Sequence, residues 1–228
     1  MKKHGSFAAL VVSIIFFTSA GFAQDSTLIK LKNHFALQFQ LGDNIRLTSF
    51  EGFTISGKYH LSKFAIRAGI EAGNFNTKSN NRNFTADTLT SSTEEENHGI
   101  NIRINLQGLY YFNVYKDVAA YTGGGPFFAF YKRNKTAYYN YSSPEKKIQK
   151  ENSTEIGLTA LIGVEWFVKE NIGLSAEYGI NFSNYHMTID LISEPINGSN
   201  TPKTFNSAEY KIFQVYANSA KLGIVIYS

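Results

Sequence analysis

Apolar and polar residues alternate with a period of two over long parts of the chain. The clearest run is GINIRINLQGLYYFNV at 99–114, where mainly aliphatic and aromatic residues occupy every second position and mainly polar residues fall between them. Only a β-strand sorts side chains onto opposite faces in this way. At about 3.3 Å per residue the run extends on the order of 45 Å, which is long enough to cross a bilayer at a tilt. The pattern therefore predicts membrane-spanning strands.

Eight runs of this kind are predicted, with no helical segment between them. They are 33–41, 50–60, 64–73, 99–114, 118–131, 154–168, 172–182 and 208–228. Short turns follow the second, fourth and sixth runs, whereas long polar segments at 74–98, 132–153 and 186–207 are predicted as loops. Turns at one rim and long loops at the other are typical of an antiparallel up-and-down transmembrane β-barrel of eight strands. We assign this barrel domain to 33–228.

The N-terminus has the pattern of a secretory signal peptide. Lys2 and Lys3 precede an apolar stretch at 7–17 and a small-residue exit at 18–23, which predicts cleavage after Ala23. A transmembrane anchor is the alternative, but the apolar stretch is shorter than the roughly 18 residues that a spanning helix needs. We expect 1–23 to be removed and 24–32 to form a periplasmic lead-in.

The polar face decides which side of the predicted barrel meets lipid. It carries charged residues in mid-strand positions, with glycines among them: Lys58, Arg67, Glu71, Arg103, Glu165, Glu177 and Lys221. The interior of an eight-stranded barrel is just wide enough to be filled by side chains, so both charge signs can neutralise one another there. The alternative is a lipocalin-like soluble binding protein of the periplasm, with the apolar face inside.

Aromatic residues of the apolar face gather near the predicted short turns. They are Tyr59, Phe64, Tyr110, Phe112 and Trp166. Rings at one height match the aromatic girdle at a membrane interface.

Composition narrows the picture further. The formal charge is +4, of which two charges belong to Lys2 and Lys3, so the balance does not indicate a nucleic-acid partner. The chain has no cysteine, which excludes a disulfide framework and cysteine-ligated zinc.

Four motifs carry a family resemblance over nearly all of 32–228: YTGGGP at 121–126, GVEWF at 163–167, LSAEY at 174–178 and KLGIVIYS at 221–228. The chain resembles the eight-stranded outer-membrane β-barrel proteins with the small-barrel architecture of the OmpA transmembrane domain, OmpX and OmpW. The resemblance implies location in the cell outer membrane, contact with its lipid and lipopolysaccharide, and recognition of the last strand by the barrel assembly machinery. Members of the family usually end in an aromatic residue, whereas this chain ends in Ser228.

Candidate chemistry inside the barrel is limited to carboxylates. Glu165 and Glu177 face the interior on adjacent strands, so they are either a catalytic pair or ion-pair partners of Lys58, Arg67 or Arg103. We favour ion pairs. The glycines at 123–125 are followed by Pro126 and no helix, so they favour close strand packing or a β-bulge over a dinucleotide site.

A lipid A-modifying enzyme is a further alternative. The deacylase type uses a His-x-Ser arrangement, but here Asn181 stands where the histidine would be, and His186 lies beyond Ser183. A serine without a base is not activated. We therefore predict no catalytic residue, no cofactor and no metal site. The predicted function is that of a non-enzymatic outer-membrane barrel with a structural, adhesive or small-solute porin-like role.

The long polar segments differ in charge. One is acidic, with Glu94, Glu95 and Glu96 beside His98, and the next is basic, with Lys132, Arg133, Lys135, Lys146, Lys147 and Lys150. Solvated loops are the plain interpretation. Divalent cations at the acidic cluster and lipopolysaccharide phosphates at the basic one are the functional alternatives.

Overall fold

A computed structural model describes residues 32–42, 53–85, 88–115, 117–140, 145–196, 202–218 and 220–228. The predicted signal peptide and most of the lead-in at 24–32 lie outside these residues, as does most of the turn predicted at 42–44. The described part contains nine strands: β1 Phe35–Leu41, β2 Phe53–Leu61, β3 Phe64–Thr85, β4 Thr88–Tyr115, β5 Val118–Asn140, β6 Glu145–Lys169, β7 Ile172–Pro195, β8 Thr204–Ala217 and β9 Lys221–Tyr227. No helix in these ranges has the length and apolarity that a membrane span requires.

The strands form a closed antiparallel ring, as predicted. Each strand from β1 to β7 pairs with the next, and β9 pairs with both β7 and β1. Both β8 and β9 pair with β7, so they are two segments of the predicted eighth strand. Between them the Asn218 amide donates a hydrogen bond to the Gly179 carbonyl at 2.7 Å. The fold is an all-β, up-and-down barrel of eight strands, one of them interrupted.

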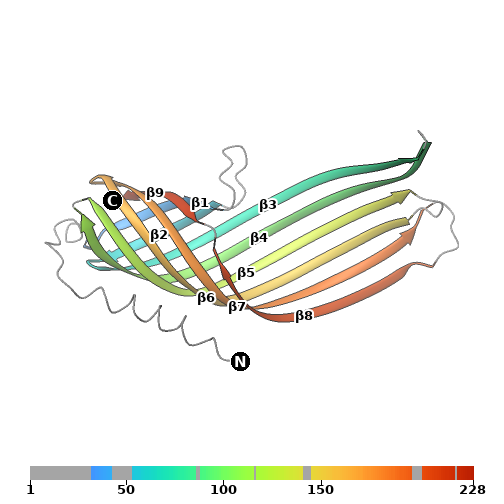
Figure 1. Cartoon of the computed structure of the whole chain (residues 1–228). Helices are drawn as coiled ribbons and strands as arrows, with labels where there is room; N and C mark the ends of the chain where they lie inside the picture. Colours follow the sequence, from blue (N-terminus) through green and yellow to red (C-terminus); the bar gives the residue numbers. More distant parts are fainter. Residues whose placement is uncertain are drawn as a thin grey trace, which may run out of the picture.

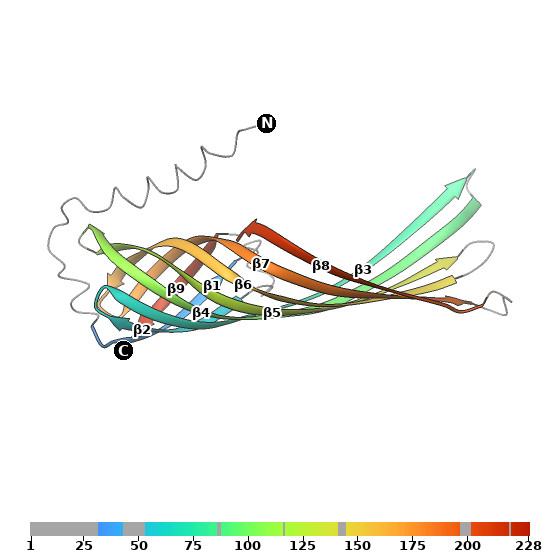
Figure 2. The same cartoon turned by 90° about the horizontal axis from the view of Figure 1, so that it is seen from below.

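The three predicted long loops are wrong, because most of their residues continue the strands. β3 pairs with β2 only as far as Ala72. Beyond this level β3 to β8 form an open six-stranded sheet, called the extended sheet below. Figures 1 and 2 show it projecting from the barrel, whereas β1, β2 and β9 stay in the ring. Alternation of apolar and polar residues did not identify these strands, because both faces of these segments are mainly polar. Cross-strand pairing, including Lys78 opposite Glu96, still favours strands there.

The predicted orientation of the barrel is confirmed. Outward side chains are apolar and exposed, as for Ile104, which is 53% exposed, while its neighbour Asn105 is 9% exposed. Lys58 and Arg67 are buried in the centre. An apolar exterior around a charged interior is the arrangement of a transmembrane barrel, and it contradicts the lipocalin-like alternative.

The predicted aromatic cluster also lies where expected. Tyr59, Phe64, Tyr110 and Trp166 are exposed near the short turns, whereas Phe112, the fifth predicted member, is half-buried. Phe64 lies opposite Tyr110 in the register, and their ring centroids are 5.0 Å apart.

The triple glycine lets β5 lie close to both neighbouring strands. A Cβ atom on Gly123 would overlap the Gly108 carbonyl oxygen of β4, and one on Gly124 would overlap the Thr159 carbonyl oxygen of β6. No side chain fits against backbone atoms so close. The predicted role in close packing is confirmed.

Candidate functional site in the lumen and the extended sheet

The lumen near the short turns is filled by a buried ion pair. Lys58 Nζ of β2 lies 2.9 Å from Glu165 Oε2 of β6, and both side chains are fully buried. Lys58 also donates a hydrogen bond to the Tyr111 hydroxyl at 2.8 Å, and the Tyr227 hydroxyl donates to Glu165. The strands that carry this pair face one another across the barrel, so the contact closes the lumen.

A second pair lies further along the lumen. Arg67 Nη1 of β3 is 2.7 Å from Glu177 Oε2 of β7. The remaining Arg67 N–H groups donate to the side-chain oxygens of Gln107 and Gln38, and the Tyr121 hydroxyl donates to Glu177. Each polar group is thereby satisfied away from water.

A third pair joins Lys221 of β9 to Glu71 of β3 at 2.6 Å. Lys221 also donates to Thr54 Oγ1. Since Glu165 and Glu177 each bind a different cation, the favoured ion-pair interpretation is confirmed, and the two carboxylates do not form a joint acid–base pair.

Arg103 does not take part in an ion pair with either predicted carboxylate. Its Nη2 donates to Thr159 Oγ1 at 3.0 Å and to Asn181 Oδ1 at 2.9 Å, and its guanidinium lies 3.6 Å from the centroid of the Phe127 ring. Neutral groups and a cation–π contact therefore hold this charge.

Glu155 is a buried carboxylate that the sequence analysis did not single out. It is 2% exposed, and four neutral groups donate to it: Ser183 Oγ at 2.5 Å, Tyr216 at 2.8 Å, and Gln214 and Tyr131 at 3.2 Å. Glu155 and Glu165 are an even number of positions apart in the same run, so alternation could have placed Glu155 on the lumen face as well. Its partners come from three other strands, which the sequence does not show.

The structure does not bring Ser183 and His186 together. Ser183 is 1% exposed and faces the lumen, whereas His186 lies on the opposite face of β7 and pairs with Glu209 at 2.9 Å. Glu155 accepts a hydrogen bond from Ser183 at 2.5 Å, and both side chains are buried.

The predicted acidic cluster is divided by the pleat of β4. Glu95 pairs with Lys135 at 3.0 Å, and Glu96, on the other face, pairs with Lys78 at 2.5 Å. The hydrogen bond from Lys78 to Glu96 raises the pKa of Lys78. No group of three or more metal-ligating side chains converges within the described ranges.

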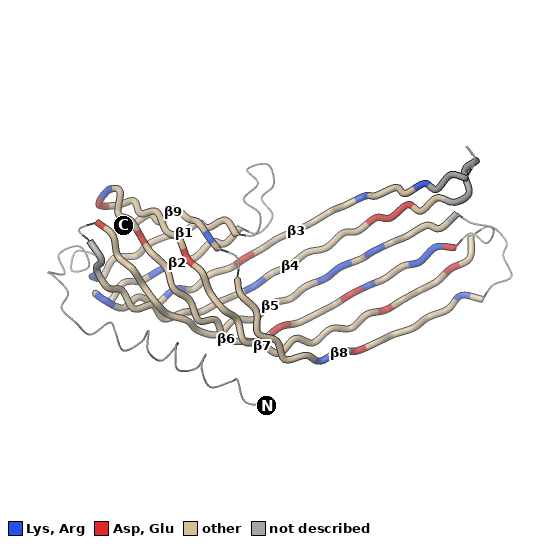
Figure 3. Tube along the Cα trace, viewed as in Figure 1, with Lys and Arg blue, Asp and Glu red and all other residues tan. Residues whose placement is uncertain are grey.

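The predicted basic residues are divided in the same way. Alternation places Arg133, Lys135 and Lys147 on the face continuous with the lumen, and Lys132, Lys146 and Lys150 on the outer face. Figure 3 shows these charges along β5 and β6, next to the carboxylates of neighbouring strands. The extended sheet is thus charged on both faces.

Paired charges also occur along the free edge of the extended sheet. Lys211 of β8 lies 2.9 Å from Glu209, and its hydrogen bond lowers the pKa of that carboxyl group. Lys203 lies 2.6 Å from Glu194 and likewise lowers the pKa of its partner.

No protein-family model matches the chain, and no curated protein matches it in sequence. Solved structures similar to it include a major outer membrane protein from Thermus thermophilus, with a TM-score of 0.43, 11% identity, and coverage of 86% of this chain and 98% of that one. Acinetobacter baumannii CarO matches with a TM-score of 0.43 and 9% identity over 86% and 98% of the two chains. Neisserial surface protein A matches with a TM-score of 0.33 and 20% identity over 85% and 92%. Similarity at this level assigns no function.

Proposed function

We propose that this chain is a non-enzymatic protein of the outer membrane whose closed barrel holds an adhesive sheet at the cell surface. The observation that carries the proposal is the change of architecture along the strands. Along β1 and β2 the ring is closed and its lumen is filled. Beyond the level of Leu41 and Phe53, six strands continue as an open sheet (Figure 1). The closed part suits a membrane, and the open part suits contact with a partner.

The outer surface of the ring supports the membrane location. Exposed aliphatic and aromatic side chains cover successive strands, for example Phe39, Ile55, Ile70 and Ile104, each at least 43% exposed. Water would penalise such a continuous apolar surface, whereas acyl chains would not. The N-terminal signal peptide and recognition of β9 by the barrel assembly machinery belong to the same proposal.

The filled lumen argues against a wide diffusion pore. Three cation–carboxylate pairs cross it, and their residues are buried or nearly so. A porin-like role is therefore limited to very small solutes.

The extended sheet offers two surfaces for contact. On the lumen-side face, Ile212 and Tyr210 of β8 lie opposite Tyr185 and Met187 of β7, and Ile212 and Tyr210 are 48% and 45% exposed. Aromatic and aliphatic side chains exposed together are typical of binding surfaces. On the outer face, Lys132 and Lys150 lie near the ring, where lipopolysaccharide phosphates would meet them.

A cell-attachment assay tests the adhesive role. Cells producing the protein should attach to a target surface more than cells lacking it, and the double variant Tyr210→Ser/Ile212→Ser should lose that gain. Phe213→Ser/Val215→Ser is the matched control on the opposite face of β8 and should retain it. Equal attachment by cells that produce the protein and cells that lack it would contradict the proposal.

The absence of enzymatic activity is tested separately with Ser183→Ala. We expect the lipid A profile of producing cells to equal that of cells lacking the protein, with no change in the variant. A modified lipid A species that requires Ser183 would show an enzyme instead.

A further inference from the structure

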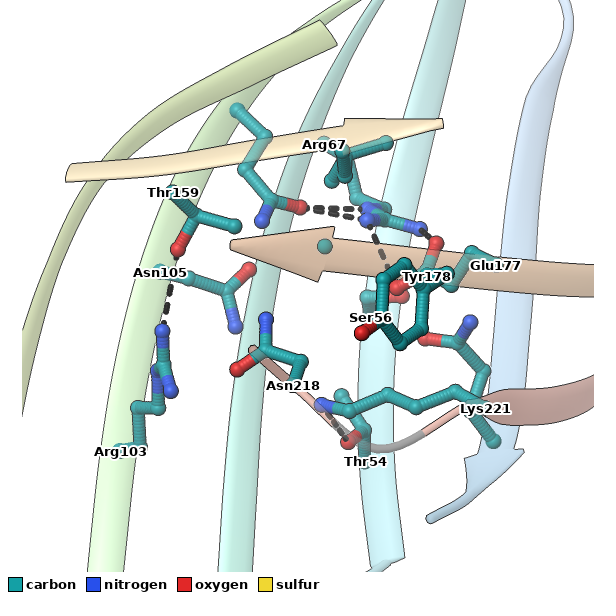
Figure 4. Close-up of a pocket in the computed structure, with 14 residues that line it drawn as sticks. Thr54, Ser56, Arg67, Arg103, Asn105, Thr159, Glu177, Tyr178, Asn218 and Lys221 are labelled. Carbon is teal, nitrogen blue, oxygen red and sulfur yellow. Dashed lines mark hydrogen bonds and ion pairs between the residues drawn. The ribbon is translucent and has the colours of Figure 1, made fainter. Parts of the chain in front are cut away.

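The described part of the lumen balances its own charges. Its four cations are matched in number by four carboxylates: Lys58, Arg67, Arg103 and Lys221 against Glu71, Glu155, Glu165 and Glu177. Figure 4 shows Arg67 bonded to Glu177, and Arg103 bonded to Thr159, around a small cavity. The extended sheet differs, because one of its edges combines a free strand with exposed apolar side chains.

That edge is β8. Among the described strands it pairs with β7 alone, and its residues from Thr204 to Phe213 are all exposed. On an edge strand, alternate backbone N–H and C=O groups point away from the sheet, where another strand can bind them. Large apolar side chains, each at least 45% exposed, lie along this edge: Phe205, Tyr210, Ile212, Phe213 and Val215.

The charges of β8 are arranged symmetrically about Tyr210. Glu209 precedes it and Lys211 follows it, on the same face, and the two side chains are 2.9 Å apart. Glu209 also contacts His186 of β7. If two copies of β8 pair antiparallel with Tyr210 opposite Tyr210, Glu209 of each copy lies opposite Lys211 of the other. Opposite charges in facing positions stabilise an antiparallel pair.

This Tyr210-centred register also matches other side chains by kind. Phe205 of each copy lies opposite Val215 of the other, and Asn206 lies opposite Gln214. Sliding one strand by two residues places either Glu209 opposite Glu209 or Lys211 opposite Lys211, and like charges in facing positions are unfavourable. The charges therefore select one register.

The other edge of the extended sheet lacks this self-complementarity. Beyond Ala72, β3 carries Lys78 and Arg82 but no carboxylate. Two copies of this edge would bring together only cations, which oppose strand addition. The asymmetry between the two edges singles out β8.

We propose that β8 is a homophilic interaction surface, through which two copies of this chain join their extended sheets edge to edge in the Tyr210-centred register. The same strand is used by both copies, so the contact closes after two. The inference rests on the proposed location of the extended sheet outside the membrane, and it does not require attachment to any other surface.

The geometry places the two copies in facing membranes. Antiparallel pairing puts the ring-proximal end of one β8 beside the distal end of the other. Because the extended sheet projects away from the ring (Figures 1 and 2), the two rings lie at opposite ends of the joined sheet. The partner is thus the same protein on a neighbouring cell.

Cell–cell aggregation tests the charge pairing. Cells that produce the protein should aggregate and settle faster than cells that lack it. Glu209→Lys and Lys211→Glu should each abolish this aggregation, because like charges then face one another. A mixture of cells with one variant and cells with the other should aggregate again, since opposite charges then meet across the pair. Single variants that aggregate as well as the unaltered protein, or a mixture that stays dispersed, would overturn the proposal.

Two controls keep this result specific. Both altered side chains are more than half exposed, and the change in gel migration on boiling verifies that each variant folds. Attachment to a target surface is measured in parallel: its loss with intact aggregation counts against the proposed adhesive face alone, whereas intact attachment without aggregation overturns the homophilic contact alone.

A single cysteine tests the register. The chain has no native cysteine, and Tyr210→Cys places a thiol opposite its own copy with the Cα atoms about 5 Å apart, within the reach of a disulfide. Mild oxidation of dense suspensions of producing cells should give covalent dimers on a non-reducing gel. Asn206→Cys, on the same face of β8, is the matched control and should give none, because its copy lies about 26 Å away. Equal dimer yields from the two variants, or no dimer from Tyr210→Cys, would overturn the proposed register.

Discussion

At the scale of single residues, the lumen is built from charges that are expensive to bury alone. Lys58 and Glu165 are fully buried, 107 residues apart in sequence and 2.9 Å apart in space. Removing one partner of such a pair leaves an uncompensated charge, whereas replacing both with neutral groups is often tolerated. The pair therefore specifies the arrangement of the strands more than it adds to their stability.

Lys58→Met should lower the free energy of unfolding by about 3–5 kcal/mol, because Glu165 loses its counter-charge. The double variant Lys58→Met/Glu165→Gln should recover most of that loss. Urea unfolding in detergent micelles measures both. Lys78→Met, in the exposed Lys78–Glu96 pair, is the control and should change the midpoint little. A double variant as unstable as the single one would contradict this account.

Gly163 shows how the lumen accommodates large rings. A Cβ atom there would overlap Cζ of Tyr121, whose ring covers the glycine. Gly163→Ala should cost about 1–3 kcal/mol of stability through overpacking, and Tyr121→Leu should relieve it. Gly108→Ala is the matched control, since nothing lies within 4 Å of its added Cβ. Equal unfolding midpoints for the two alanine variants would exclude the predicted clash.

At the scale of strands, the ring has one apolar face and one polar face, whereas both faces of the extended sheet are polar. In the ring every second residue faces acyl chains, so register is strongly specified. In the extended sheet both faces carry polar groups, and charged pairs such as Lys135–Glu95 support the pairing. The same strand thus passes from lipid to water without a change of backbone conformation.

A charge on the outer face should therefore be costly only within the ring. Ile104→Lys should destabilise the barrel by about 2–4 kcal/mol, the cost of lysine near the middle of a bilayer. Ile148→Lys, on the outer face of β6 in the extended sheet, should cost much less. Unfolding in lipid bilayers compares the two variants. Similar losses would place the membrane elsewhere on the molecule.

At the scale of the whole molecule, a closed ring and an open sheet share six strands. The ring has no edges, because β9 pairs with β1. Beyond the ring the edges are β3 and β8, and charged side chains such as Lys78 and Lys211 lie along them. Charged side chains on an edge oppose uncontrolled strand addition.

The closed ring predicts that the protein migrates differently on a gel before and after boiling, since the unboiled barrel stays folded in detergent. Single-cysteine probes add the orientation, because the chain has no native cysteine. A spin label at Ile104→Cys should contact lipid, and one at Arg103→Cys should not. A label at residue 104 buried in the centre would contradict the fold.

Much of this architecture could be predicted from local pattern. The eight strands and their two faces follow from alternation, the short turns from the spacing between runs, and the outward aliphatic face from the charges on the opposite face, and the structure confirms them. The extended sheet could not be predicted that way, since strands with two solvated faces lose the apolar period. Among the lumen carboxylates, the positions of Glu165 and Glu177 in the alternation identified them as inward-facing, whereas Glu155 was not singled out.

The sequence by itself determined how side chains sort onto the two faces of most strands, because side-chain alternation is a local property of the extended backbone. The charges on one face favoured a membrane barrel, and the exposure of the apolar face in the tertiary structure confirmed it. The sequence also determined three antiparallel neighbour pairs, since short turns join the second run to the third, the fourth to the fifth and the sixth to the seventh. Only the tertiary structure decided that Lys58 meets Glu165, that Arg67 meets Glu177, and that Arg103 meets neither. Those contacts join residues far apart in the chain, and closure of the ring fixes their distances.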